Sequence, residues 1–346
     1  MKKYIFTFIL ILLLLTGCKS SSEEENFPVE IKVLILPKFE VGELSGDFPG
    51  EAQYYYEEYC AGGLEYEIPG SEKEQKLYVK DGVALYVTGM GKANAAMSLT
   101  ALLTDDRFDF TNAYLLSTGC AGSSCDYTVM GDVFIITAAV DYDLGHHVDS
   151  SEIADPSGST WFHDDNYDSS ACKILDQQLM DQAYELTRDI KLETTEKTRA
   201  YMEEAFQGES WATRDPRVLR GTSVTGDNYW KGEQGHLNAL KIVETYHCPD
   251  PYATTEMEDL ALAVVADRMG MLDRLLIVRD SVDLDIFMNG STPESLWTPD
   301  SDESLTSSDS SESADIFETA MKNNFVVGRV LIDAICDQTL SPALEN

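Results

Sequence analysis

Short apolar runs rich in β-branched residues alternate with segments of helical periodicity along most of this chain, and that alternation limits the folds available to it. Such runs, each closed by glycine, proline or polar residues, are typical of buried strands. Strands that alternate with helices form layered α/β folds with a parallel or mixed sheet. The expected strands are residues 31–36, 83–87, 113–116, 132–140, 218–221 and 274–278, and the expected helices are 92–103, 172–187, 194–206, 255–269 and 316–336.

The N-terminus has the order of a secretion signal. Two lysines lie in residues 1–3, a run of about a dozen mostly apolar residues follows, and small residues precede Cys18. This resembles a bacterial lipoprotein signal, in which the chain is cut before a cysteine that becomes lipidated. A membrane span is the alternative, but it needs roughly 20 apolar residues. We expect residues 1–17 to be a signal peptide and Cys18 to anchor an exported lipoprotein at the periplasm or cell surface.

The region after the signal is expected to form one domain. Residues 18–29 form a flexible tether, 30–338 the domain and 339–346 a tail. Residues 291–314 are rich in Ser, Asp and Glu, so we expect an acidic loop that is disordered or acts as a mobile flap. No later stretch is as hydrophobic as the signal, so no further spanning helix is expected.

Charge narrows the choice of partners. The chain has 61 acidic and 25 basic side chains and a formal net charge of −36 at pH 7. Nucleic acid and anionic lipid surfaces repel such a field, so neither is an expected partner.

Cysteines and histidines leave several readings open. Six cysteines besides Cys18 allow 15 pairings in an oxidising compartment. Cys120 is either a free thiol or half of a disulfide with Cys125, because only geometry decides. His146 and His147 form the only histidine cluster in the sequence and lack the spacing of a zinc site, so they are interpreted as loop or rim residues and no metal is expected.

Two acidic segments carry most of the functional signal. Residues 255–260 (Thr-Glu-Met-Glu-Asp-Leu) open an expected helix, and residues 279–285 (Arg-Asp-Ser-Val-Asp-Leu-Asp) close the next strand. Open α/β sheets bind ligands at the carboxyl ends of their strands. Carboxylates there can hold sugar hydroxyls and protonate a leaving base. Helix capping is the alternative, because acids in a first turn are favoured by the helix dipole.

Two glycine segments follow expected strands. Residues 89–91 are Gly-Met-Gly and residues 119–122 are Gly-Cys-Ala-Gly. Missing side chains let backbone N–H groups approach a ligand, or simply allow a tight corner. Neither segment is a full dinucleotide-binding fingerprint.

Taken together, these segments resemble the purine nucleoside phosphorylase and uridine phosphorylase superfamily, most closely its purine nucleoside permease branch, over residues 30–338. The resemblance implies a three-layer α/β fold with a central mixed sheet flanked by helices. The matching segments are residues 39–43 (Phe-Glu-Val-Gly-Glu), 89–96, 119–122, 225–230 (Thr-Gly-Asp-Asn-Tyr-Trp), 256–259 and 279–285.

The resemblance also implies roles for individual residues. Glu258 would bind the ribose 2′ and 3′ hydroxyls with Met257 against the sugar, and Asp283 would protonate the purine as it leaves. Val282 stands where the family usually has Ser, which affects how Asp283 is oriented. The remaining implied substrate contacts are Tyr229, stacked on the base, its neighbour Trp230, Asp227, Gly89, Gly119 and Cys120.

The chemistry of N-glycosidic cleavage agrees with these roles. Positive charge develops on the ribose and negative charge on the base, so a carboxylate near the sugar and an acid near the base both stabilise the transition state. For Asp283 to hold a proton near neutral pH, burial or neighbouring carboxylates such as Asp280 and Asp285 must raise its pKa.

The attacking group is less well defined. Phosphorylases of this superfamily hold phosphate with arginines, one of them near the second glycine segment, where this chain has Ser117 and Thr118. Water is therefore favoured, with Glu43 or Glu40 as the base, and orthophosphate remains a candidate co-substrate. No other cofactor is expected.

Three functions follow from this reading. The first is an exported enzyme that binds purine nucleosides and cleaves their N-glycosidic bond by hydrolysis or phosphorolysis. The second is a nucleoside-binding lipoprotein that supplies a separate membrane transporter without catalysis. The third is an acidic surface protein whose pocket is only structural. A homo-oligomer is compatible with each of them.

Overall fold

A computed structural model of the 346-residue chain describes residues 28–72, 75–155, 158–287 and 311–341. The expected signal peptide, Cys18 as the expected lipidation site, most of the tether and residues 291–310 of the acidic loop lie outside these ranges.

Among the described residues, ten strands form one mixed sheet at the centre of the molecule. The strands that run through the middle are almost fully buried, as their apolar sequences predict. In sheet order they are β11 (Cys172–Ile174), β8 (Val133–Asp141), β12 (Val218–Thr225), β13 (Tyr252–Glu256), β7 (Tyr114–Ser123), β2 (Val33–Leu36), β5 (Val83–Tyr86), β4 (Lys76–Lys80) and β3 (Leu64–Glu67), with β14 (Leu275–Leu284) outside this path.

Strand β14 closes part of the sheet on itself. It pairs in parallel with β7 and antiparallel with β8, while β13 joins β12 to the end of β7. Strands β7, β14, β8, β12 and β13 therefore form a closed ring. This closure brings the carboxyl ends of β7, β13 and β14 together, and the candidate site lies there.

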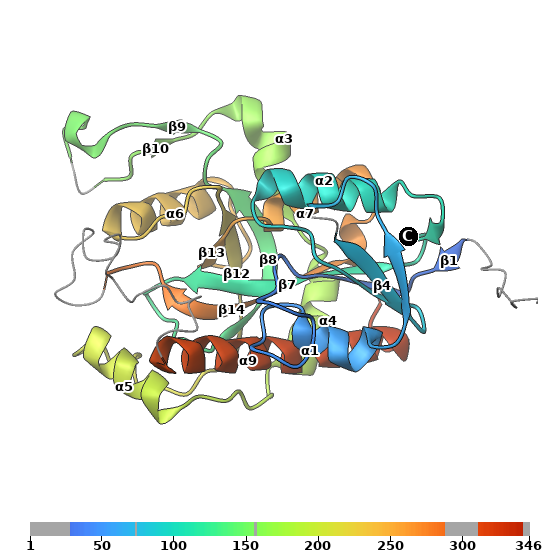
Figure 1. The fold of residues 1–346 in the computed structure, drawn as a ribbon. Coiled ribbons are helices and arrows are strands. Elements are labelled where there is room, and N and C mark those ends of the chain that lie inside the picture. Colours follow the sequence, from blue (N-terminus) through green and yellow to red (C-terminus); the bar gives the residue numbers. More distant parts are fainter. Residues whose placement is uncertain (1–27, 73–74, 156–157, 288–310, 342–346) are drawn as a thin grey trace, which may run out of the picture.

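Helices cover both faces of the sheet (Figure 1). Helices α2 (Lys92–Leu103) and α7 (Asp259–Arg268) pack together on one face, and α9 (Ser311–Cys336) crosses the other face with α4 (Gln177–Thr187) and α1 (Gln53–Tyr55) beside it. This arrangement confirms the expected three-layer fold with a central mixed sheet.

Shorter elements complete the described chain. They are α3 (Asp168–Ala171), α5 (Glu196–Ala205), α6 (Glu233–Thr245), the π-helix Tyr56–Cys60, the 3-10 turns Ser150–Glu152, Asp165–Tyr167 and Leu272–Arg274, and the strand pairs β1 (Val29–Glu30) with β6 (Phe108–Asp109) and β9 (His146–His147) with β10 (Trp161–Phe162).

Two expected helices start later than the sequence suggested. Residues 172–174 form strand β11, and α4 begins after Asp176, whose side chain accepts a hydrogen bond from the Leu179 N–H at 2.7 Å. Residues 252–256 form strand β13, so the expected helix 255–269 is shortened to α7. Asp176 is thus the N-cap of α4, whereas at α7 the N-cap residue Glu258 makes no capping hydrogen bond and the Glu256 carboxylate accepts the N–H groups of Glu258 and Asp259.

The second glycine segment is also placed differently. It was expected at a corner after a strand, but residues 119–122 continue β7, which ends at Ser123. Gly122 meets Thr255 of β13 there, since a Cβ on Gly122 would lie 3.0 Å from the Thr255 methyl group. The glycines therefore allow strands and side chains to approach closely inside the sheet.

Within the described ranges, no helix combines the length and the apolar character that crossing a membrane requires.

Candidate functional site

A pocket lies at the carboxyl ends of β13 and β14. It holds about 320 Å3 of empty space, part of which is open to solvent. Aromatic, apolar and acidic side chains are mixed in its wall, as in sites that hold a heterocycle attached to a polar group. Its lining residues are Gly122, Asn228, Tyr229, Trp230, Thr255, Glu256, Met257, Asp283, Leu284 and Asp285.

Asp283 contributes the acid that faces Tyr229 and Lys231. Its carboxylate lies 2.7 and 3.0 Å from the Lys231 ammonium and accepts a hydrogen bond from the Tyr229 hydroxyl at 2.8 Å. The backbone N–H of Leu284 donates a further hydrogen bond to it at 2.8 Å. A buried acid, a lysine and a phenol therefore form one polar group in the pocket wall.

The acids near Asp283 in sequence turn to other partners. Asp285 binds His236, with 2.7 Å between the carboxylate and Nδ1. Asp280 is fully buried, and desolvation and the nearby Glu51 raise its pKa well above its usual value. The expected crowding of carboxylates around Asp283 is thus replaced by contact with a lysine: a register shift in β14 separates Asp283 from Asp280, and Asp285, although it lines the same pocket, is paired with His236.

The aromatic residues of the pocket have different surroundings. Tyr229 is 59% exposed and reaches Asp283 through its hydroxyl. Trp230 stacks on Tyr142, with ring centroids 5.2 Å apart and planes at 17°. Gly235 permits this packing, since a Cβ there would lie 2.2 Å from the indole ring. Tyr229 is therefore the ring that can meet a ligand, and Trp230 is mainly a fixed wall.

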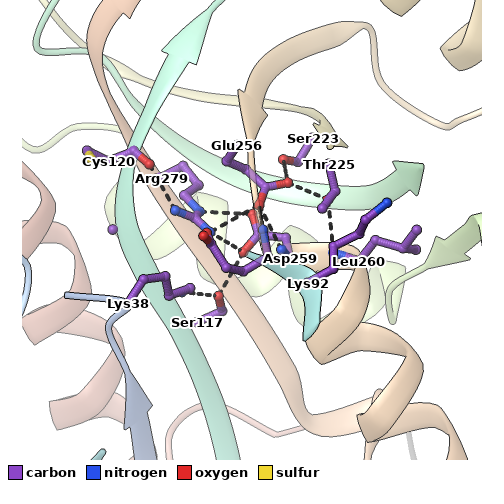
Figure 2. A network of polar contacts seen from close by, with 12 residues as sticks. Lys38, Lys92, Ser117, Cys120, Ser223, Thr225, Glu256, Asp259, Leu260 and Arg279 are labelled. Atoms are coloured by element: carbon purple, nitrogen blue, oxygen red, sulfur yellow. Dashed lines mark hydrogen bonds and ion pairs between the residues drawn. The ribbon is translucent and has the colours of Figure 1, made fainter. Parts of the chain in front are cut away.

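Behind the pocket, Arg279 forms the centre of a buried network of acids (Figure 2). Its guanidinium contacts both oxygens of Asp259, at 2.9 and 2.8 Å. The same group lies 3.2 Å from Glu256 and 3.1 Å from Glu258 and donates to the Cys120 carbonyl at 2.8 Å. One cation thus joins β14, β7 and the start of α7.

Glu256 belongs to the scaffold. Its carboxylate accepts the backbone N–H groups of Glu258 and Asp259, at 2.5 and 2.7 Å, and the hydroxyls of Ser223 and Thr225. The helix-capping alternative therefore holds for Glu256.

Glu258 differs from Glu256 in its partners. One oxygen accepts the Gly91 N–H at 2.9 Å and the other contacts Arg279 at 3.1 Å. A carboxylate has about four acceptor positions. Among the described residues Glu258 uses two of them, which leaves capacity for two hydroxyl donors. Met257, the residue before it, lines the pocket, whereas Glu258 itself lies behind the wall.

Burial changes the pKa values of this network. Desolvation and the neighbouring Asp259 raise the pKa of Glu256 to about 7, and desolvation also raises the pKa of Glu258. Burial would raise the pKa of Asp259 as well, but Arg279 and Lys38 outweigh it and the pKa is lowered. Desolvation lowers the pKa of Lys38 to about 8. Burial and the neighbouring charges therefore shift the pKa values of these three acids in different directions.

The first glycine segment, residues 89–91, contacts acidic side chains closely. Gly91 has φ +86° and presents its N–H to Glu258. Gly89 also has φ +86°, and a Cβ on it would lie 2.2 Å from the Glu72 carboxylate. Asp227 joins the same corner, because its carboxylate accepts the Lys92 N–H at 2.9 Å. Neither Gly89 nor Asp227 is among the pocket-lining residues.

Gly119 and Cys120 lie beside an acid that the sequence did not single out. The Glu51 carboxylate accepts the backbone N–H groups of Cys120, at 2.9 Å, and of Lys38, at 2.7 Å. A Cβ on Gly119 would lie 2.3 Å from Glu51. Burial, with Glu51 next in importance, raises the pKa of the Cys120 thiol well above its usual value, so this thiol is neutral.

The two acids considered as bases after the first strand are not among the pocket-lining residues. Glu40 is about half buried, and its carboxylate accepts the N–H groups of Val41, Gly50, Ala52 and Gln53. Glu43 is exposed in the same loop. Glu40 thus fixes the loop before α1.

Two lysines were also not identified from the sequence, Lys231 in contact with Asp283 and Lys38 beside Ser117. Lys231 directly follows the aromatic pair 229–230, and that adjacency was an available signal. Lys38 is 2% exposed, and its ammonium donates to Ser117 at 2.7 Å and to two backbone carbonyls. It lies beside Ser117 and Thr118, where phosphorylases of the superfamily have an arginine. The sequence gave no local signal for Lys38, because strands distant in sequence bury it.

The six described cysteines are all free thiols, so no bond joins Cys120 to Cys125. His146 contacts Asp164 at 3.0 Å, and His147 contacts the Tyr142 carbonyl at 2.9 Å. Both histidines are exposed on β9, in agreement with their interpretation as rim residues.

Solved structures of similar fold are nucleosidases. A 5′-methylthioadenosine/S-adenosylhomocysteine nucleosidase from Neisseria meningitidis aligns with a TM-score of 0.52 and 18% identity, over 88% of this chain and 99% of that one. The corresponding enzyme from Helicobacter pylori gives a TM-score of 0.53 and 14% identity, over 88% and 99% of the two chains. These similarities support the nucleoside phosphorylase-like fold.

Curated relatives carry the family name. A probable purine nucleoside permease of Schizosaccharomyces pombe is 31% identical over 227 residues, which cover 57% of this chain and 63% of the relative. A purine nucleoside permease of Candida albicans is 27% identical over 211 residues, covering 56% of this chain and 52% of the relative. The chain thus spans between about half and two thirds of the length of these relatives.

The family model described as purine nucleoside permease (NUP) matches residues 30–339, which include every segment of the pocket and of the Arg279 network. This chain belongs to the purine nucleoside permease family.

Proposed function

We propose that this protein binds purine nucleosides in the pocket at the ends of β13 and β14 and cleaves their N-glycosidic bond. The observation that carries the proposal is the presence of two acids with different surroundings, one in the pocket wall and one behind it. Asp283 lies in the pocket wall beside a lysine and a phenol, and Glu258 has acceptor positions left for two hydroxyls behind Met257.

In this proposal each group acts on one part of the substrate. The ribose lies against Met257 and donates its 2′ and 3′ hydroxyls to Glu258. The base lies against the exposed ring of Tyr229. Asp283 and Lys231 lie 2.7 Å apart beside the position of the base, and this pair delivers the proton to it.

The bond change is a displacement at the anomeric carbon. The bond from that carbon to the purine nitrogen breaks, its electron pair stays on the purine, and the purine takes the proton held between Asp283 and Lys231. The attacking oxygen forms the new bond, and negative charge near the sugar stabilises the cation-like transition state. A positioned acid of this kind contributes about 10²–10⁴-fold.

Water is the preferred nucleophile. The residues that line the described pocket include no arginine, and the Arg279 guanidinium is already bound to three carboxylates. Orthophosphate would lack the bidentate arginine contacts that suit it. Glu51, next to Cys120, joins Glu40 and Glu43 as a candidate base, because it lies beside the second glycine segment.

The proposal places the protein outside the cytoplasm as a lipoprotein attached through Cys18. The order of charged, apolar and small residues before Cys18 supports this. Mass spectrometry of the protein from its native membrane fraction would find a chain that begins at a lipidated Cys18. A mature chain that begins at Met1 would contradict it.

A second function, nucleoside binding that supplies a separate transporter without catalysis, is favoured by one observation. The acceptor positions of the Asp283 carboxylate are already filled by hydrogen bonds from Lys231, Tyr229 and the Leu284 N–H. If these contacts persist when a nucleoside is bound, Asp283 orients the ligand and transfers no proton.

Base release separates the two functions. The full-length chain in mild detergent is incubated with inosine, adenosine and uridine, with and without orthophosphate, and free base is measured by chromatography. Release of purine base without phosphate supports hydrolysis, and release only with phosphate supports phosphorolysis. Calorimetric binding without release supports the transporter-linked function, and absence of both contradicts nucleoside recognition.

A further inference from the structure

A cluster of metal-ligating side chains lies beside the pocket. Cys125 and Asp126 occupy the turn after β7, and His236 lies in the first turn of α6. One ligand atom from each of the three residues lies within 4.8 Å of the others. His236 lies 111 positions after Cys125, so no ligand spacing in the sequence reveals the cluster.

We propose that Cys125, Asp126 and His236 form a binding site for a zinc-like divalent cation. The inference does not depend on nucleoside binding or cleavage. A thiolate, an imidazole and a carboxylate are donors that suit Zn2+, and three protein ligands leave a fourth position for water.

The geometry supports this assignment. The His236 Nε2 lies 3.4 Å from the Asp126 carboxylate and 4.0 Å from the Cys125 sulfur. Ligand atoms of a tetrahedral zinc site are about 3.3–3.6 Å apart, as follows from zinc–ligand distances of about 2.0–2.3 Å. The sulfur is 3.9 Å from Nδ1 as well, so the half-buried Cys125 side chain must rotate to reach the Nε2 side of the ring.

The histidine is already held in the orientation that a ligand needs. Its Nδ1 contacts the buried Asp285 carboxylate at 2.7 Å, which directs Nε2 towards Asp126. A carboxylate behind a ligating histidine is the usual support of a zinc site and raises the basicity of the free nitrogen. Asp285 is itself fixed, because its N–H donates to Ser123 and its carbonyl accepts from Gly232.

Charge also favours a cation here. Binding exchanges one divalent cation for the protons on the Cys125 sulfur and on Nε2 of His236. The thiolate and the Asp126 carboxylate then neutralise the two positive charges. Asp285 also lines the nucleoside pocket, so a bound cation would stiffen one wall of that pocket.

Cobalt serves as the spectroscopic probe. The full-length protein, reduced and treated with chelator, is titrated with Co2+. We expect one Co2+ per chain, with the visible bands of a tetrahedral site and a near-ultraviolet thiolate charge-transfer band. Addition of Zn2+ should remove both. A wild-type protein that gives no thiolate band overturns the proposal.

Variants locate the ion. Cys125→Ser should abolish the thiolate band, and Asp126→Asn and His236→Gln should weaken Co2+ binding by roughly 10- to 100-fold. Because His236 is buried, circular dichroism must show that each variant is folded. If His236→Gln does not fold, the result rests on Cys125→Ser and on Asp126→Asn, whose side chain is half exposed.

Two matched controls address other sites. Cys172→Ser alters a thiol that hydrogen-bonds Cys248, and His163→Asn alters the exposed group of His163, Asp165 and Asp168. Both should keep the thiolate band. A band that survives Cys125→Ser but is lost in Cys172→Ser would place the ion elsewhere and overturn the assignment.

Discussion

Glu256 and Glu258 lie two residues apart in one acidic segment, yet they use their carboxylates differently. Glu256 accepts two backbone N–H groups and two hydroxyls and also contacts Arg279. Glu258 contacts only Gly91 and Arg279 among the described residues. The number of acceptor positions filled by the protein itself therefore distinguishes an acid that holds the fold from one able to hold a ligand.

Asp283 of β14 and Asp259 of α7 differ in another way, namely in the burial of their partners. Asp283 lies in the pocket, and two of its partners, Lys231 and Tyr229, are side chains that can move when a ligand binds. The partners of Asp259, in contrast, are the fully buried Arg279 and Ser117. We therefore expect substitutions at Asp283 and Glu258 to affect nucleosides, and substitutions at Arg279 and Glu256 to affect folding.

The largest effect is expected for Asp283→Asn. If Asp283 supplies the proton to the leaving purine, kcat/KM for base release should fall by about 10²–10⁴-fold, measured by chromatography of free base. Asp273→Asn, a matched change of an acid that is 47% exposed, should leave the rate unchanged. Equal rates in both variants would remove Asp283 from the chemistry.

The next effect concerns stability. Arg279→Met leaves three buried acids without their cation, so the free energy of unfolding should fall by about 3–5 kcal/mol. Denaturant titration followed by circular dichroism measures this. Arg188→Met, at a site 46% exposed, is the control and should change stability by less than about 1 kcal/mol. A loss of that small size in Arg279→Met would mean that the network does not hold the fold.

Glu256 should make stability depend on pH. Its folded pKa of about 7 lies above its ordinary value of 4.5, so the folded state binds more protons between these values. Its contribution is complete below about pH 4.5 and is lost as pH rises towards 7, a change of roughly 2–4 kcal/mol. Unfolding midpoints of wild type and Glu256→Gln, compared from pH 4.5 to 7, test this, since the variant should lack that part of the slope. Parallel curves would show that Glu256 titrates normally.

Glu258→Gln should affect nucleoside binding more than stability, the reverse of Glu256→Gln. Loss of two hydroxyl partners at a charged acceptor should weaken nucleoside binding by roughly 10- to 100-fold, measured by calorimetry, with unfolding affected less than in Glu256→Gln. A 2′,3′-dideoxynucleoside should bind wild type and Glu258→Gln equally, because it lacks both hydroxyls. If it instead discriminates between them, Glu258 acts on another part of the ligand.

The smallest effects compare the two acids of the loop after β2. Glu40→Gln should cost about 1–3 kcal/mol of stability because Glu40 accepts several backbone N–H groups. Glu43→Gln, at an exposed position, should change stability by less than about 0.5 kcal/mol. Thermal unfolding measures both. A loss of base release in Glu43→Gln at unchanged stability would identify Glu43 as the base.

The sequence predicted the layers of the fold, six of the ten strands of the central sheet and the helices α2, α4, α5, α7 and α9. The predicted helix 92–103 has the same bounds as α2, because its periodic apolar residues and preceding glycine are local signals. Helices α1, α3 and α6 and the sheet strands β3, β4, β11 and β13 were missed, and β7 and β14 are longer than predicted. Glycines and acids inside β7 and β14 suggested that these strands end earlier than they do. The pairing that closes the sheet on itself overrides this local propensity.

For the site, the sequence predicted the acidic segments but not their partners. Asp283, Met257 and Tyr229 line one pocket, whereas Glu258 is not among its lining residues. The contacts of Lys231 with Asp283 and of Glu51 with Cys120 join residues far apart in the chain, and no periodicity encodes them. Which acids cap a helix and which remain available depends on these long-range contacts, so only the structure could separate Glu256 from Glu258.

The most direct test is a crystal structure of the full-length protein with a purine C-nucleoside, whose carbon–carbon glycosidic bond cannot be cleaved. We predict that the heterocycle lies beside Tyr229 with its edge at Asp283, and that the ribose covers Met257 with both hydroxyls within hydrogen-bonding distance of Glu258. A ligand bound at another place, or no ligand at a concentration that saturates binding in solution, would contradict the account.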